Sequence, residues 1–301
     1  MDFLKEIGFA DWRSVRVGEN LTVRVKSGVS NVGAFTAMPE KKQELVKKTF
    51  KAIKRVRQEE GAQSEALAAL LKFAKALLPP DFVDLVGAVP WSGGIALARH
   101  LDSTLHASEE APCTVSELVG RGKGPKIAVE LGCGAAALPS IICQRKGFIP
   151  IATDIEDCLP AARENLETNL SEVCKQRGLP ATRESSNGCA VVAKLEWGKG
   201  SVTALQKLLG LSDEHFRNCL VVGADVIYNP ESSGVLLDTV EEFCNFGATV
   251  LFATKSRRQL LPSFLAQAEG RGMKVVEEGR CSDEDLQCSV VFHSFSRSPS
   301  C

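Results

Sequence analysis

The sequence predicts an α/β protein with a mainly parallel sheet and helices on both of its faces. From residue 126 onward, short apolar runs of strand length alternate with amphipathic segments of helical spacing, the pattern of repeated strand–helix units. Hydrophobic residues make up 44% of the 301 positions and charged residues 24%, which is enough apolar material for a substantial core. No apolar run approaches the roughly 20 residues that a membrane-spanning helix needs.

The alternating region divides into elements of ordinary length. Strands are expected at residues 127–131, 149–153, 190–195, 219–224, 249–253, 274–278 and 288–295. Helices are expected between most of them, at 136–146, 158–174, 202–209, 231–243 and 260–269.

A different pattern precedes this region. Valine and leucine alternate with charged or polar residues over 15–17 and 21–25, on either side of a possible turn at 18–20, which predicts a β-hairpin. Two helices are expected next, at about 39–60 and 64–78, and a Pro-Pro pair ends the second one.

We therefore expect two parts. Residues 1–85 form an N-terminal hairpin and helical extension, and residues 86–301 form the α/β domain that carries the activity. The extension is expected to pack on the domain and to help shape the entrance to its site.

The first of these helices is strongly basic. Its basic residues are Lys41, Lys42, Lys47, Lys48, Lys51, Lys54, Arg55 and Arg57. Such a face is either a nucleic-acid contact or a solvated helix surface. Glutamates interleave with the basic residues and no aromatic residues accompany them for base stacking, which favours the solvated surface.

Charge and cysteine usage exclude several classes of protein. The formal net charge of −1 provides no bulk attraction to nucleic acid or to an anionic membrane. The eleven cysteines are scattered and include no CxxC pair, which argues against a disulfide framework and against a metal site. The first ten residues lack the apolar segment of a signal peptide, so we expect a cytoplasmic protein, with the nucleus as the alternative.

A glycine-rich turn follows the first strand of the alternating region. Gly132 and Gly134 lie between that strand and a helix, where glycines let the backbone approach a ligand beside the helix N-terminus. The next strand ends near Asp154, whose carboxylate can accept hydrogen bonds from both hydroxyls of a ribose. This combination predicts a nucleoside-cofactor site. A dinucleotide is disfavoured because the third glycine of the GxGxxG pattern would fall at Ala137.

The same turn reads Glu130-x-Gly132-x-Gly134 and resembles motif I of the class I methyltransferases, which use S-adenosyl-L-methionine. The resemblance implies a Rossmann-like fold with a seven-stranded, mostly parallel sheet whose last strand is antiparallel. It also implies that the turn faces the methionyl part of the cofactor. The family usually has a glycine where this chain has Ala136, and alanine is acceptable there only if its φ is negative.

Three further segments resemble the seven-β-strand protein-lysine methyltransferases that act on non-histone proteins. Trp91 stands in a segment like the family's Trp-containing entry segment, and Glu196-Trp197 is similar to its acid-Trp pair at the adenine end of the pocket. The segment from Ala224 to Tyr228 resembles the family's DxxY motif, which begins here at Asp225. Tyr228 is the only tyrosine in the sequence.

This resemblance extends over residues 89–295 and implies a role for each matching residue. The implied catalytic residues are Asp225 and Tyr228. The implied cofactor-binding residues are Trp91, Glu130, Gly132, Cys133, Gly134, Ala136, Asp154, Glu196, Trp197 and Ala224. Asn165 and Asn169 match the family's spacing and are expected to brace the pocket. Lys255, Arg257 and Arg258 either contact an acidic substrate surface or form a solvated loop.

The predicted function is S-adenosyl-L-methionine-dependent methylation of a lysine side chain in a non-histone protein, by a monomeric enzyme. By family resemblance the protein substrate is a chaperone, an AAA-type ATPase or a translation factor. The residues leave open a histidine, an N-terminal amine or a small-molecule amine as the acceptor. They also leave open a cofactor-binding adaptor with little catalysis.

Overall fold

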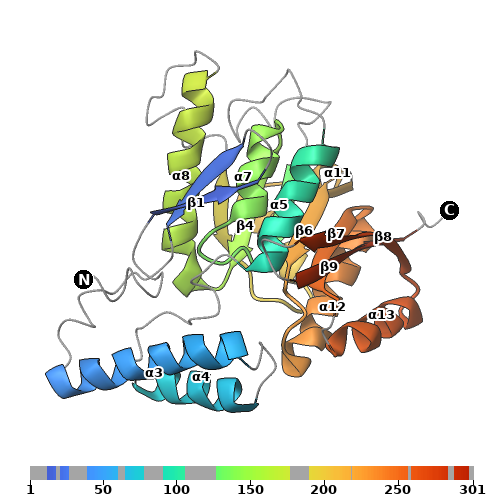
Figure 1. Cartoon of the computed structure of the whole chain (residues 1–301). Coiled ribbons are helices and arrows are strands. Elements are labelled where there is room, and N and C mark those ends of the chain that lie inside the picture. Colours follow the sequence, from blue (N-terminus) through green and yellow to red (C-terminus); the bar gives the residue numbers. More distant parts are fainter. Residues whose placement is uncertain are drawn as a thin grey trace.

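The computed structural model describes residues 12–17, 21–26, 39–59, 65–77, 91–105, 127–176, 190–217, 219–256, 259–283 and 288–297. Within these ranges a seven-stranded sheet stands between two layers of helices, with a two-stranded sheet outside one layer (Figure 1).

The elements agree closely with the expected ones. The strands of the large sheet are β3 (Ile127–Leu131), β4 (Ile149–Asp154), β5 (Val191–Lys194), β6 (Leu220–Ala224), β7 (Thr249–Lys255), β8 (Lys274–Asp283) and β9 (Cys288–Ser296). The helices around it are α5 (Ser92–Thr104), α7 (Leu138–Arg145), η1 (Glu156–Cys158), α8 (Leu159–Gln176), α10 (Ser201–Leu209), α11 (Asp213–Arg217), α12 (Pro230–Phe246) and α13 (Leu260–Gly270). The N-terminal elements are β1 (Trp12–Arg16), β2 (Thr22–Lys26), α3 (Glu40–Glu59) and α4 (Glu65–Leu77).

The strand order in the sheet is β5-β4-β3-β6-β7-β9-β8. The five strands from β5 to β7 pair in parallel, and β9 is antiparallel to both of its neighbours. The expected mostly parallel sheet with an antiparallel last strand is therefore confirmed. Strand order reverses between β3 and β6, and the carboxyl ends of strands at such a reversal are where open α/β sheets bind ligands.

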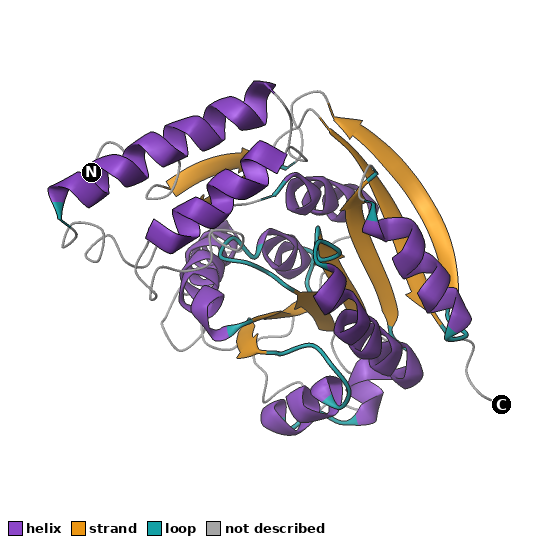
Figure 2. Cartoon of the chain, turned by 90° about the horizontal axis from the view of Figure 1, so that it is seen from below, coloured by secondary structure: helices purple, strands orange, loops and turns teal. Residues whose placement is uncertain are grey.

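Apolar side chains on both faces hold the sheet between its helices. All five residues of β3 are buried, as a central parallel strand requires. One core lies under α10, α11, α12 and α13, where Phe252, Phe264 and Phe295 pack edge to face or tilted against one another. The other core lies under α5, α7 and α8. Figure 2 shows these helices around the sheet, seen from the end where the parallel strands finish.

The β1–β2 hairpin packs on the outside of the second helical layer. Val15, Val23 and Val25 are buried and belong to the same apolar cluster as α5, α7 and α8. The Asn169 side-chain amide donates to the Arg24 carbonyl at 2.7 Å, so this contact braces the hairpin, and the expected bracing of the pocket by Asn169 stays a prediction. The Arg99 Nε donates to the Arg16 carbonyl at 3.2 Å. The hairpin is thus tied to two helices of the α/β domain, whereas the boundary at residues 85 and 86 lies outside the described residues and stays a prediction.

Helices α3 and α4 pack against each other through one face of α3. That face contains Val46, Ile53 and Val56, all of which are buried. The pair lies beyond the carboxyl ends of the parallel strands, at the lower edge of Figure 1. Lys48, Lys51 and other basic residues of α3 point to solvent.

Two helices were not among the expected ones. Helix α5 begins with Ser92-Gly93-Gly94, and glycine has low helix propensity, so the sequence gives little sign of a helix there. Helix α11 has only five residues. In the described ranges, no helix is both long enough and apolar enough to cross a membrane.

Candidate functional site

The glycine turn between β3 and α7 has the conformation that its sequence indicates. Gly132 has φ +67° and Gly134 has φ +57°, values in the left-handed region that favours glycine. A Cβ atom at Gly132 would lie 3.0 Å from Val226 Cγ1 and 3.2 Å from Trp197 Cζ2. Trp197 and Val226 therefore pack closely on the turn, and a side chain at Gly132 would crowd both of them as well as strain the backbone.

Asp154 lies at the end of β4 and is hydrogen-bonded to the glycine turn. The Gly134 N–H donates to Asp154 Oδ2 at 2.7 Å, and the Ile155 N–H donates to Oδ1 at 2.8 Å. The carboxylate thus joins the end of β4 to the glycine turn. Beside it Ile155 is 45% exposed and presents an apolar surface next to the carboxylate. Sequence reasoning missed Ile155.

Glu130 lies behind the turn. Its side chain is buried, and Oε2 accepts from the Ser140 N–H at 2.9 Å and from the Ser140 hydroxyl at 2.5 Å. Burial raises the pKa of this carboxyl from 4.5 to about 8, against the opposing effect of the Ser140 hydrogen bonds. Through these two hydrogen bonds Glu130 joins β3 to the first turn of α7. Its contact with a cofactor stays a prediction.

The raised pKa of Glu130 predicts a pH dependence of folding stability. Between about pH 4.5 and 8 the folded protein keeps a proton on Glu130 that the unfolded chain has released. The free energy of unfolding should therefore fall as pH rises through this window, by on the order of a few kcal/mol. Glu130→Gln, which never ionises, should flatten this part of the curve. Urea unfolding of the wild type and of Glu130→Gln at a series of pH values measures this free energy. If it depends on pH in the same way in both proteins, the raised pKa of Glu130 is contradicted.

Ala136 and Cys133 are buried parts of the same turn. Ala136 does not have positive φ, so alanine is acceptable at this position. The strained residue is its neighbour Ala137, with φ +44°, directly before α7. Cys133 is 6% exposed, and its burial raises the pKa of the thiol. Its backbone N–H donates to the Thr153 carbonyl at 3.0 Å, so Cys133 serves the turn itself, and its predicted contact with a cofactor stays a prediction.

Replacing Ala136 by glycine, which restores the family pattern, should not improve cofactor binding. Ala136 is not in the left-handed region, so glycine would relieve no backbone strain at this position. The Kd of S-adenosylhomocysteine should therefore change by less than about twofold, a change in binding free energy of well under 1 kcal/mol. Stability should fall by roughly 1 kcal/mol, because glycine adds backbone entropy to the unfolded chain. Calorimetric titration and thermal unfolding test this pair of outcomes, and a tenfold tighter Kd would refute the first.

Trp197 and Glu196 follow β5 and have different surroundings. Trp197 is half-buried against the core and lies over Gly132. Glu196 points to solvent and pairs with Lys194, with Oε1 at 2.7 Å from Nζ. That ammonium lowers the pKa of the Glu196 carboxyl. Trp197 thus lies where the resemblance implied a pocket wall, and the carboxylate beside it faces outward.

Asp225 is the most constrained residue of the site. It follows β6 with φ +54°, and its backbone N–H donates to the Ala253 carbonyl at 2.9 Å. Its carboxylate is buried, and Oδ2 accepts from the Gly93 N–H at 2.9 Å. Among the described residues, Oδ1 has no hydrogen-bond partner. A buried acceptor held in strained backbone without a partner is typical of a functional residue.

Gly93 brings the N-terminus of α5 onto this carboxylate. A Cβ atom at Gly93 would lie 2.6 Å from Asp225 Oδ2, so the contact requires glycine. The adjacent Gly94 lies against Ala224, with its Cβ position 4.0 Å from Ala224 Cβ. Gly93 was not among the predicted site residues, although a glycine pair one residue beyond Trp91 was a visible signal of close approach.

Trp91 and Tyr228 complete the same edge of the site. Trp91 is half-buried immediately before α5, and the Lys255 ammonium lies 5.5 Å from the centroid of its ring. Tyr228 is 45% exposed. Arg257 and Arg258, grouped with Lys255 by the sequence, lie outside the described residues. The structure thus gathers Trp91, Asp225, Tyr228 and the glycine turn at the carboxyl ends of neighbouring strands.

Comparison with known proteins identifies relatives of this chain. A family model described as lysine methyltransferase matches residues 78–271. A mouse protein, protein N-lysine methyltransferase METTL21A, is 28% identical over 184 residues, covering 61% of this chain and 67% of the mouse protein.

Solved structures resemble the chain only distantly. A putative tRNA (m1A22) methyltransferase from Streptococcus pneumoniae, in complex with S-adenosyl-L-methionine, has a TM-score of 0.38 at 12% identity, covering 68% of this chain and 74% of that one. An O-methyltransferase family protein from Burkholderia thailandensis has a TM-score of 0.37 at 10% identity, covering 99% of this chain and 82% of that one. TM-scores of this size carry no functional information.

Proposed function

The chain belongs to the lysine methyltransferase family, so it is an S-adenosyl-L-methionine-dependent enzyme that methylates protein lysine, and we propose that Asp225 and Tyr228 hold the acceptor amine. The observation that supports this assignment most directly is the unpartnered Oδ1 of Asp225. It is a buried acceptor at the carboxyl end of β6, next to the glycine turn. Natural structures rarely leave such an atom without a partner, which supports a role for it toward a ligand.

The residues around the glycine turn fit S-adenosyl-L-methionine. The left-handed glycines at 132 and 134 would let the turn pass beside the methionyl part, and the Asp154 carboxylate at the end of β4 would accept from ribose hydroxyls. Trp197 and the exposed Ile155 provide apolar surfaces for the adenine. Ala224 and Trp91 would border the methyl group, at the edge where Asp225 lies. Glu130 and Glu196 would act indirectly, because one is buried behind the turn and the other pairs with Lys194.

The chemistry requires a neutral, aligned amine. When bound, S-adenosyl-L-methionine would supply a sulfonium methyl group, and in-line attack by the amine nitrogen would form the N–C bond as the C–S bond breaks and S-adenosylhomocysteine leaves. A free lysine has a pKa of about 10.4, so its ammonium must lose a proton to solvent first. Asp225 Oδ1 would then accept a hydrogen bond from the amine and orient its lone pair. A carboxylate by itself favours the ammonium, so we assign Asp225 to orientation. The Lys255 cation at the same edge opposes a second positive charge there.

The acceptor we propose is a lysine of a non-histone protein. Family resemblance suggests a chaperone, an AAA-type ATPase or a translation factor, encountered by a monomeric enzyme in the cytoplasm or the nucleus. The basic surface of α3, which lies beyond the carboxyl ends of the strands, would border the approach of that substrate (Figure 1). This role for the extension rests on its position and on the exposure of Lys48 and Lys51.

A radiolabelled-methyl assay tests the proposal. The purified chain is incubated with S-adenosyl-L-methionine and a cytosolic extract, and the labelled residue is identified by mass spectrometry. We expect a methylated lysine in a protein, and we expect Tyr228→Phe to slow its formation. A label on histidine, on N-terminal amines or only on small molecules would contradict the lysine assignment. Failure of the wild-type chain to bind millimolar S-adenosylhomocysteine would contradict every enzymatic assignment, whereas binding without methylation of any substrate would favour the cofactor-binding adaptor.

A further inference from the structure

Helix α12 begins at the proposed acceptor site and continues along the proposed cofactor site. It begins two residues after Tyr228, where Asn229 Oδ1 caps it by accepting from the Glu231 N–H at 3.0 Å. Three turns into the helix its buried side chains reach the segment that follows Trp197. One rigid element thus contacts the loops after β5 and after β6.

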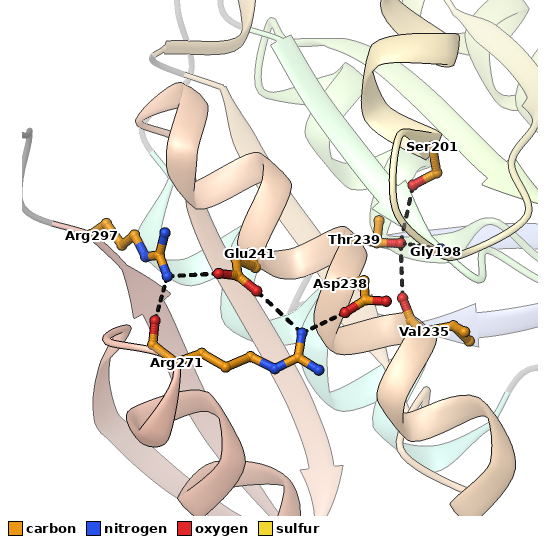
Figure 3. A network of polar contacts seen from close by, with 8 residues as sticks. All are labelled: Gly198, Ser201, Val235, Asp238, Thr239, Glu241, Arg271 and Arg297. Carbon is orange, nitrogen blue, oxygen red and sulfur yellow. Dashed lines mark hydrogen bonds and ion pairs between the residues drawn. The ribbon is translucent and has the colours of Figure 1, made fainter.

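Thr239 makes the central contact between α12 and that segment. Its side chain is completely buried, and Oγ1 accepts from the Gly198 N–H at 2.9 Å and lies 3.1 Å from Ser201 Oγ. The same hydroxyl donates to the Val235 carbonyl at 3.2 Å (Figure 3). One threonine hydroxyl has one proton and two lone pairs, so these three contacts use its full capacity.

Glu242, one turn further along α12, holds the same segment. Its carboxylate accepts from the Val202 and Thr203 N–H groups at 3.2 and 3.0 Å, and from the Thr203 hydroxyl at 2.6 Å. These are the unpaired donors of the first turn of α10. The chain from Gly198 to Thr203 is therefore fastened to α12 at two places.

An adjacent face of α12, about 100° around the helix, makes separate contacts. Arg271 Nη1 contacts Asp238 Oδ1 at 2.6 Å and Glu241 Oε2 at 3.2 Å, and Arg297 contacts Glu241 at 2.8 Å (Figure 3). These ion pairs join α12 to the end of α13 and to the residue that follows β9. Asp238 is adjacent to Thr239 in sequence but does not touch the Gly198 segment in any contact of Figure 3, which makes it a natural control.

We propose that Thr239 is a positioning residue for cofactor binding: by fixing Gly198 it holds the neighbouring Trp197 ring over Gly132. Gly198 has φ +145°, a conformation that does not by itself keep the preceding tryptophan in place. Without the Thr239 hydroxyl, the ring could move away from the turn, and the proposed adenine site would lose one wall. This inference rests on the proposed function, because it assigns Trp197 to the cofactor site.

Thr239→Val tests the proposal, since valine keeps the volume of the side chain and removes its hydroxyl. We expect the Kd of S-adenosylhomocysteine and the KM of S-adenosyl-L-methionine to rise by about tenfold. The kcat at saturating cofactor should stay within about threefold, because Asp225 and Tyr228 are untouched. Thr239→Ser, which restores the hydroxyl, should return the Kd to within about twofold of the wild-type value.

Asp238→Asn is the matched control on the adjacent face of the helix, and the Kd of this variant should equal that of the wild type. A folded Thr239→Val with unchanged Kd overturns the proposal, and so does an equal rise in Asp238→Asn. If Thr239→Val does not fold, Glu242→Gln replaces it, with a Kd raised about threefold as the supporting outcome and an unchanged Kd as the contrary one. A wild-type chain that fails to bind S-adenosylhomocysteine would be a failure of the proposed function instead.

Discussion

Asp225→Asn should lower kcat by about 100-fold or more while leaving the fold intact. Asparagine matches aspartate in shape and is one of the few residues that tolerates the left-handed conformation found here, φ +54°. Its amide oxygen can still accept from the Gly93 N–H. Its NH2 group must then take the place of Oδ1, the atom without a partner. A donor at that place cannot accept a hydrogen bond from the acceptor amine.

The measurement is a single-turnover methyl-transfer assay on the identified substrate, together with thermal unfolding and S-adenosylhomocysteine titration. The melting temperature and the Kd should remain close to the wild-type values. An activity within about fivefold of wild type would mean that Oδ1 does not orient the acceptor, since fivefold is only about 1 kcal/mol. A parallel collapse of stability would mean that the carboxylate serves the fold.

Gly93→Ala should be nearly as damaging, and for a steric reason. The new methyl group would lie 2.6 Å from Asp225 Oδ2 and 2.7 Å from Cγ, so the carboxylate must move. The carboxylate is buried and its backbone is already strained, so it has little room to adjust. We expect a loss of about 100-fold in kcat and a destabilisation of roughly 1–3 kcal/mol.

Gly94→Ala is the matched control for this substitution. Its methyl group would lie 4.0 Å from Ala224 Cβ, an ordinary contact, so no neighbour has to move. Alanine also favours the helix by roughly 0.5–1 kcal/mol over glycine. Stability measured by urea unfolding should therefore stay the same or rise. If the two variants lose stability equally, the damage at Gly93 comes from the helix start and not from Asp225.

Most of the α/β domain was predictable because its elements have strong periodicity. The strand expected at 127–131 has these bounds in the structure, and the helix expected at 260–269 ends only one residue later, at Gly270. Helix α5 was missed because its two N-terminal glycines have low helix propensity. Those glycines are there for a contact with β6, some 130 residues away, which local sequence cannot reveal.

The site was predictable to the level of segments, and less so to the level of side-chain roles. The glycine turn, Asp154, Trp197 and Asp225 meet at neighbouring strand ends, as expected from motif positions. Glu130 opens the glycine-turn motif, yet its side chain is buried against Ser140. Glu196 precedes Trp197 in the acid-Trp pair, yet its side chain points to solvent and pairs with Lys194. A motif determines which loop a residue occupies, whereas the direction of its side chain depends on the partners that folding brings.

By itself the sequence determined the α/β alternation, the glycine turn and the family-like segments, because these depend on local spacing and composition. Only the tertiary structure decided how they act together. It placed Gly93 against Asp225, bound Gly198 to Thr239 on α12, and set the left-handed strain at Ala137 instead of Ala136. Each of these depends on contacts between residues far apart in the chain or on the exact path of the backbone, and local periodicity carries no information about either.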